Sequence, residues 1–185
     1  MRQFPEDRQK LKELMLYVSQ RCGEKHNFGS VILYKILYFS DHFAYGKLGE
    51  PITGADYVKE KHGPIPRNAY PARQDLEREG RLVVNQVPKG RGTLHKPVAL
   101  DTPDMSLFSD AQIAIVDAVI DRFHGSSTRK VRTASHALAA WRAYQIGDTI
   151  PYETVFIAPN QKLTRKEHQL GQEIARRRGW LRSAR

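Results

Sequence analysis

The sequence predicts an α+β fold that is mostly α: a helical domain with a small antiparallel β-sheet or hairpin, winged-helix-like in outline. Apolar residues recur at helical spacing in several stretches, and capping signals precede some of them. Two β-type runs flank a glycine-containing basic segment in the middle of the chain. The chain has 185 residues, of which 40% are hydrophobic, so it can bury a core of its own. We therefore expect a single domain over residues 1–185.

Two helices are predicted at the start of the chain. The first should run from about Pro5 to Cys22, because proline suits a first helical turn and Gly23 follows the last apolar position. The second should be capped by Ser30 and reach about Tyr45. Since it is apolar on nearly every side, it should be the central, buried helix.

The segment after the second helix predicts turns and a third helix. Residues 52–59 suggest a loop followed by a short strand near Tyr57. Gly63-Pro64-Ile65-Pro66 is expected to form a rigid turn, because its two prolines fix φ. Pro66 also fits the first turn of a third helix, which should end before Gly80.

Two β-type runs, at residues 82–84 and 96–100, predict a hairpin. Residues 88–92 lie between them and should form a long, flexible and basic loop. Together with the short strand near Tyr57, the hairpin could make a three-stranded sheet.

The second half of the chain predicts further helices. Ser109 and Gln112 form a capping box, with Phe108 and Ile113 at the two hydrophobic staple positions. The helix that they begin should end at Gly125.

Two more helical stretches should follow. Ser127 should cap a stretch that extends to Trp141. Thr164 and Glu167 form another capping box, at the start of a basic helix over about residues 164–179.

Composition limits the compartment and the partners. The formal net charge of +10 favours nucleic acid, an acidic membrane surface or an acidic protein, without choosing among them. No apolar run approaches the ~20 residues that span a bilayer, and the N-terminus lacks the apolar core of a signal peptide. Cys22 is the single cysteine, so no internal disulfide is expected. We expect a cytoplasmic protein that does not bind membranes.

Two blocks of motifs follow one another along the chain. The first contains Lys35-Ile36-Leu37-Tyr38-Phe39-Ser40-Asp41, Gly49-Glu50-Pro51-Ile52-Thr53-Gly54, Tyr57-Val58 and His62-Gly63-Pro64-Ile65-Pro66. The second contains Ser135-His136, Trp141, Gly147-Asp148 and Ile150-Pro151-Tyr152-Glu153. In order and spacing both blocks resemble the motifs of the Panacea domain of SocA-like antitoxins, formerly a domain of unknown function. They occupy about residues 28–157, and Ile36 stands where the family usually has a second leucine.

The resemblance implies an antitoxin that neutralises a cognate toxin by direct protein–protein binding in a toxin–antitoxin system. It names neither the toxin nor an oligomeric state. The family-motif residues to which we assign a structural role are Lys35, Asp41, Gly54, Gly63, Pro64, Ser135, His136 and Trp141.

Two of these roles follow from elementary geometry and chemistry. Asp41 and His42 are adjacent on a helix and point about 100° apart, so they rarely share one site. Asp41 is instead expected to accept hydrogen bonds from loop amides near residues 53–54. His136 is expected to be buried, hydrogen-bonded to a carbonyl and packed beside Trp141.

An enzyme built around Asp41, His62 and His136 is a weaker alternative. Ser135 lies in no G-x-S-x-G elbow, and the histidines lack the spacing of metal ligands. The chain also has no phosphate-binding P-loop and no dinucleotide fingerprint. We therefore expect no catalytic residue, no metal and no cofactor.

Candidate contacts can be named for both leading functions. For a toxin they are Tyr45, Tyr70, Tyr144, Arg176, Arg177 and Arg178, because aromatic residues and arginine carry most interface energy. The alternative function is a winged-helix-like, DNA-binding transcriptional regulator, and an antitoxin could also bind operator DNA. Its candidate contacts are Arg67 and Arg73 on the third helix and Lys89 and Arg91 at the hairpin tip.

Overall fold

The computed structural model describes residues 4–90, 92–123 and 125–157, together with residues 169, 172, 173 and 176. The capping box at Thr164 and Glu167 lies outside the described residues, as does most of the basic helix expected over 164–179. The described part is mostly helical with small antiparallel sheets, which confirms the predicted fold class.

Helix α1 (Arg8–Cys22) begins later than predicted. The side chain of Asp7 caps it by accepting a hydrogen bond from the amide of Lys10 at 2.9 Å. Pro5 therefore precedes the helix instead of occupying its first turn. The end at Cys22 agrees with the prediction.

Helix α2 (Ser30–Leu48) is the central helix, as predicted: every residue from 32 to 42 is buried. Its N-cap is Gly29, which contributes no side-chain hydrogen bond, so the prediction that Ser30 caps the helix was wrong. The Ser30 hydroxyl instead donates to the carbonyl of His95 at 3.2 Å. The helix also continues beyond Tyr45 and ends at Gly49, whose φ of 79° is readily adopted by glycine.

The described residues form two separate sheets, and the expected three-stranded sheet, made of the hairpin and the strand near Tyr57, was wrong. Strand β1 (Tyr57–Val58) pairs antiparallel with β2 (Ile65–Pro66) and with β5 (Thr149–Ile150), in the order β2-β1-β5. The Gly63–Pro66 segment thus supplies a strand as well as a turn. Strand β1 takes these partners, and the hairpin forms a sheet of its own.

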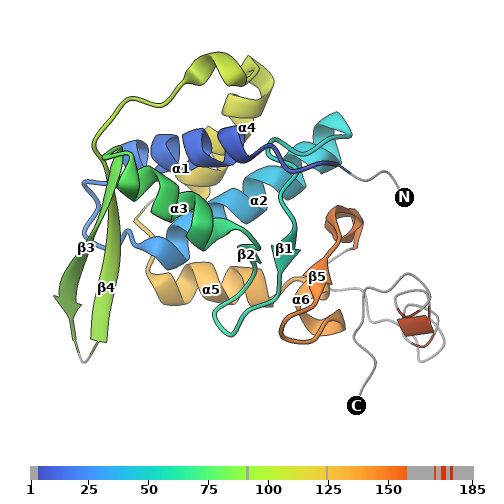
Figure 1. Cartoon of the computed structure of the whole chain (residues 1–185). Helices are drawn as coiled ribbons and strands as arrows, with labels where there is room; N and C mark the ends of the chain where they lie inside the picture. The colour runs from blue at the N-terminus through green and yellow to red at the C-terminus, as the bar shows by residue number, and fades with distance from the viewer. Residues whose placement is uncertain are drawn as a thin grey trace.

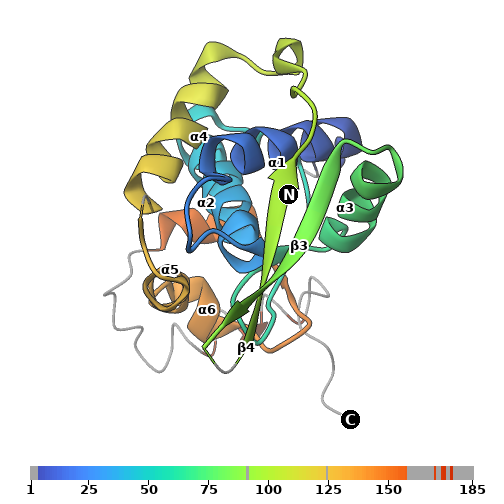
Figure 2. The ribbon, with the colours of Figure 1, turned by 90° about the vertical axis from the view of Figure 1, so that its left-hand side faces the viewer.

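The hairpin consists of β3 (Leu82–Lys89) and β4 (Gly92–Ala99), paired from Leu82 opposite Ala99 to Lys89 opposite Gly92. Its strands are longer than predicted, and Lys89 already pairs with Gly92, so the expected long loop over residues 88–92 was wrong. Gly90 has a φ of 59°, as such tight turns require. Figures 1 and 2 show the hairpin at one end of the helices, with its tip projecting away from α1.

Helix α3 (Ala69–Arg78) begins three residues after Pro66, because Pro66 belongs to β2. The helix ends before Gly80, as predicted. It packs against α1 and β3, between the helices and the hairpin.

Helix α4 (Asp110–Phe123) is preceded by the 3₁₀-helix η1 (Met105–Leu107) and starts at the predicted capping box. The Ser109 amide donates to Gln112 Oε1 at 3.2 Å, and the Gln112 amide donates to Ser109 Oγ at 3.3 Å. The reciprocal pair of bonds confirms this start.

Helix α5 (Thr128–His136) is capped by Ser127, which accepts a hydrogen bond from the Lys130 amide at 3.2 Å. This helix ends at His136, and α6 (Ala139–Ala143) follows as a separate element that carries Trp141. One helix had been predicted where the structure has two. After β5 the described chain forms a second 3₁₀-helix, η2 (Tyr152–Phe156).

The core lies where α2 is enclosed by α1, α4, α5 and η2. Its fully buried members include Leu11, Leu14, Leu33, Leu37 and Val116. Within the described part of the chain, no helix has both the length and the apolar character that crossing a bilayer requires.

Candidate functional site

The first group of motif residues surrounds the buried carboxylate of Asp41. This carboxylate accepts hydrogen bonds from the amides of Ile52 and Thr53, each at 2.8 Å, and from the Thr53 hydroxyl. The Tyr57 hydroxyl donates a further bond at 2.8 Å. Burial raises the pKa of Asp41, and these hydrogen bonds oppose that shift. Asp41 therefore ties α2 to the loop that leads into β1.

His42 lies against the same region but is not an acid–base partner. Burial lowers its pKa to about 3, so the ring is neutral at physiological pH. Its Nδ1 lies 3.0 Å from the Tyr38 carbonyl, and the ring packs among Tyr38, Tyr57 and Tyr152. No hydrogen bond between described residues joins it to Asp41.

The second group brings together Lys35, Gly63, Pro64 and Ser135. The Lys35 ammonium donates to the Pro64 carbonyl at 2.7 Å, and the whole side chain is buried. Gly63 has a φ of 102°, and a Cβ there would overlap Lys35 Cε and lie 2.8 Å from Ser135 Oγ. Only glycine therefore lets the turn approach α2 and α5 this closely.

The chemistry of this group is that of a desolvated cation, not of a nucleophile. Burial lowers the pKa of Lys35 to about 7, and the charge of Glu60 partly opposes the shift. Ser135 Oγ donates to the Arg132 carbonyl at 2.8 Å in its own helix. No hydrogen bond between described residues joins Ser135 Oγ to Lys35 or to another base that could activate it.

His136 differs from its expected role. Its ring stacks on Trp141, with centroids 3.9 Å apart and an angle of 7°. The expected bond to a carbonyl is absent: Nε2 has no partner among the described residues, and the side chain is only partly buried. Lys59, which the sequence analysis missed, holds the other side of Trp141. Its Nζ donates to the carbonyls of Trp141 and Tyr144, at 2.6 and 2.7 Å, and lies 4.3 Å from the indole centroid.

The three residues of the enzyme alternative do not converge. Asp41 lies six positions beyond Lys35 on α2, which corresponds to about 9 Å along the helix axis. His62 lies at the Lys35 end, where its Nδ1 is 3.5 Å from Arg132. In the described residues no group of three or more histidine, cysteine, aspartate or glutamate side chains could hold a metal ion.

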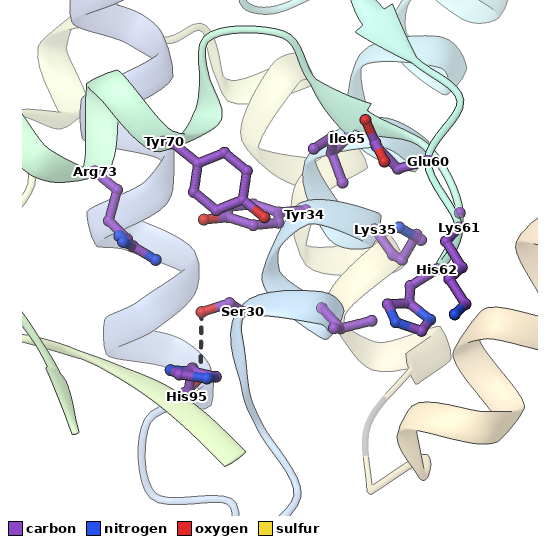
Figure 3. Close-up of a pocket in the computed structure, with 12 residues that line it drawn as sticks. Ser30, Tyr34, Lys35, Glu60, Lys61, His62, Ile65, Tyr70, Arg73 and His95 are labelled. Carbon is purple, nitrogen blue, oxygen red and sulfur yellow. Dashed lines mark hydrogen bonds between the residues drawn. The ribbon is translucent and has the colours of Figure 1, made fainter. Parts of the chain in front are cut away.

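A groove of about 390 Å³ opens beside Lys35, and we call it the Lys35 groove. Its walls come from the start of α2, the loop between β1 and β2, α3 and β4 (Figure 3). Its lining includes Ser30, Val31, Tyr34, Lys35, Glu60, Lys61, His62, Gly63, Tyr70, Arg73 and His95. The sequence analysis named several of these residues, but it missed Tyr34 and Glu60 and did not place any of them together.

The three candidate tyrosines lie in different surroundings. Tyr70 is 52% exposed on the groove rim, and its ring meets that of Tyr34 edge to face at 5.9 Å. Tyr45 is partly buried near the other end of α2, against Phe4, Tyr152 and Phe156. Tyr144 is also partly buried, and burial raises its pKa to about 12.

The other candidate contacts are only partly described. Arg176 is helical and exposed, whereas Arg177 and Arg178 lie outside the described residues. Of the DNA candidates, Arg67 donates to Thr149 at 2.7 Å, and Arg73 lies 3.5 Å from Glu77. Lys89 donates to Asn27 at 2.6 Å, and Arg91 lies outside the described residues. The described DNA candidates thus contact other parts of the protein.

The chain matches one known family. A family model described as Antitoxin SocA-like, Panacea domain matches residues 33–142, more than half of the chain. The matched stretch contains Lys35, Asp41, Gly63, Ser135 and Trp141. No curated protein matches the chain.

Proposed function

Because the chain belongs to the SocA-like, Panacea-domain antitoxin family, we propose that it neutralises a cognate toxin by binding it directly, with the Lys35 groove at the centre of the contact. The family membership supports the antitoxin role. The groove supports direct binding, because interface energy concentrates in a few aromatic and arginine side chains around a pocket.

Tyr70 is the observation that carries this proposal. It is 52% exposed, yet its ring is held against Tyr34 at 5.9 Å and against the Arg73 guanidinium at 5.5 Å. A tyrosine that is already held in place loses little side-chain entropy when a partner covers it. Tyr70 and Arg73 therefore offer a partner one aromatic and one cationic anchor on the same rim.

The proposed action is binding without catalysis. The polar groups that could have formed an active site make hydrogen bonds inside the protein instead: Asp41 with its loop, and Ser135 with its own helix. His42 is neutral and packed among aromatic rings. The groove and its rim, in contrast, are open to a partner.

The test uses the toxin protein encoded beside this gene, produced together with the antitoxin. Tyr70→Ala should weaken the complex by about 30-fold, equivalent to about 2 kcal/mol for an interface anchor, and should abolish growth rescue. Binding is measured by calorimetry on the purified proteins, and rescue by growth under toxin induction.

Phe156→Ala is the matched control, because Phe156 is 67% exposed and packs on Tyr45. Tyr45 lies eleven positions from Tyr34 on α2, or about 16 Å along the axis. The control variant should bind and rescue normally. Loss of rescue in Phe156→Ala, with normal rescue in Tyr70→Ala, would place the contact at the other end of α2.

A further inference from the structure

The first turn of α2 lies in the Lys35 groove and lacks a side-chain cap. Gly29 is the N-cap and offers no side chain, while the Ser30 hydroxyl donates away to the His95 carbonyl. Ser30 and Val31 both line the groove. Because the first amides of a helix carry partial positive charge, this end of α2 favours an anion.

A second, independent feature is the hydroxyl of Tyr34. The residue is 3% exposed, and its hydroxyl proton has no acceptor among the described residues. Burial raises the pKa of Tyr34, and the charge of Arg73 and a hydrogen bond from its guanidinium partly oppose this shift. Figure 3 shows the hydroxyl pointing to the side of the groove where Arg73 lies. A buried donor without an acceptor costs stability, so a ligand that supplies the acceptor would bind favourably.

The charges around the groove also favour an anion. Lys35, Lys61 and Arg73 line it together with two histidines and one carboxylate, that of Glu60. A second carboxylate, that of Glu77 on α3, lies 3.5 Å from Arg73 and offsets part of its charge. The positive field extends beyond the lining. The pKa of His136 is lowered, first by burial and then by the charges of Arg132, Lys35, Lys59 and His62. Such a shift is expected where several cations lie close together.

We propose that the Lys35 groove binds the carboxylate of one aspartate or glutamate side chain in the toxin, held by the Tyr34 hydroxyl and the Arg73 guanidinium. This inference rests on the proposed function, because it assigns the chemistry of the partner at the same groove. The Lys35 ammonium and the start of α2 add positive charge near the carboxylate. Arginine suits this role, since its planar group can donate two parallel bonds to a carboxylate.

A carboxylate fits the groove better than a phosphate group. Glu60 is part of the lining and repels any anion, although the charges of the lining cations outweigh it. The lining instead suits the apolar stem of an acidic side chain, because Ile65 and Tyr70 both present apolar surface to the groove. The opposing charge makes Glu60 a useful probe, because its removal should strengthen binding.

The experiment uses two peptides that differ only in charge, acetyl-Ala-Glu-Ala-amide and acetyl-Ala-Gln-Ala-amide. Their affinities for the full chain are measured by NMR titration, following the amides of Ser30 and Val31. The glutamate peptide should bind at least about tenfold more tightly, as one hydrogen-bonded charge implies. Equal affinity of the two peptides would overturn the inference.

Single substitutions then locate the carboxylate. Tyr34→Phe removes only a hydroxyl whose proton has no acceptor, so it should fold normally while binding the glutamate peptide about tenfold less tightly. Arg73→Gln should weaken binding similarly, and Glu60→Gln should tighten it. Arg142→Gln, which removes an exposed cation outside the groove lining, is the charge control and should change affinity less than about twofold. Unchanged affinity in Tyr34→Phe would overturn the inference.

Further measurements separate the partner classes and the two proposals. Inorganic phosphate or a DNA hexanucleotide that binds the groove more tightly than the glutamate peptide would overturn the choice of a carboxylate. Toxin affinity unaffected by Tyr34→Phe, in a variant that has lost the glutamate peptide, would overturn this inference and leave direct neutralisation standing. If the wild-type protein bound the glutamate peptide but no toxin, the proposed function would fail, and so would the assignment of the carboxylate to a toxin.

Discussion

Replacing Lys35 by methionine should make the protein more stable at neutral pH, and this gain should disappear as the pH rises. Lys35 is completely buried, and burial lowers its pKa from 10.5 to about 7. At about 1.4 kcal/mol for each pKa unit, keeping the ammonium charged in this site costs about 5 kcal/mol at pH 7 and below. Methionine has a similar stem and carries no charge.

The substitution also has a cost, which sets the net effect. The Pro64 carbonyl loses the hydrogen bond that Lys35 donates at 2.7 Å. An unsatisfied buried carbonyl costs about 1–3 kcal/mol, so the net gain should be about 2–4 kcal/mol at pH 6–7. A gain of this size would indicate that Lys35 is kept for function, such as binding an anionic ligand, because an apolar residue at this position would be more stable.

The sign of the pH dependence follows from proton binding. Between pH 7 and 10.5 the unfolded chain holds a proton on Lys35 that the folded chain has released. The wild-type protein therefore gains about 1.4 kcal/mol of stability per pH unit from this group across that window, and the variant does not. The advantage of Lys35→Met should shrink from pH 7 upward and reverse between about pH 8.5 and 10.

Urea unfolding of the wild-type and Lys35→Met proteins at pH 6, 7.5 and 9 measures the difference in their free energies of unfolding. The contributions of titratable groups that both proteins contain largely cancel in this difference. His136 is the exception, since Lys35 contributes to its lowered pKa. Lys47→Met, at an exposed position of the same helix, should change stability by less than about 0.5 kcal/mol. A Lys35→Met protein that is less stable than wild type at pH 6, or a gain that is constant from pH 7 to 9, would refute the reasoning.

Three further predictions concern the motif residues, and chemical denaturation measures each of them. Gly63→Ala should cost about 3 kcal/mol or more, because the new Cβ would overlap Lys35. Gly80→Ala, also at positive φ but in open space, should cost only about 1–2 kcal/mol, and equal losses would contradict the steric argument. Asp41→Ala should cost about 3–5 kcal/mol, since two loop amides and two hydroxyls lose their buried acceptor; a loss below about 1 kcal/mol would argue against the anchoring role. His136→Gln should cost about 1 kcal/mol through lost stacking on Trp141 and should leave toxin rescue intact; a stable variant without rescue would give His136 a functional role instead.

Much of the candidate site could be named from the sequence, but its assembly could not. The motif blocks contain Lys35 and Gly63, and Tyr70 was named as an aromatic candidate for the toxin contact. Arg73 was named only as a DNA contact, because of its place on the third helix. No local sequence feature singles out Tyr34, because whether its hydroxyl has an acceptor depends on the residues that surround it in the fold. The groove forms where α2, α3 and β4 approach the loop between β1 and β2. The spacing of residues along the chain does not predict that these elements come together.

The sequence by itself determined the features that depend on neighbours within a few positions. The capping box of Ser109 and Gln112 starts α4 because its two bonds join residues three apart. The apolar composition of α2 on all sides placed it in the core, since no face of it could lie in water. Only the tertiary structure decided the partners of β1, which pairs both with β2, a few residues away, and with β5, more than 90 residues later. Such pairings depend on which strands the packed helices bring together, and that choice is made by long-range packing and not by local propensity.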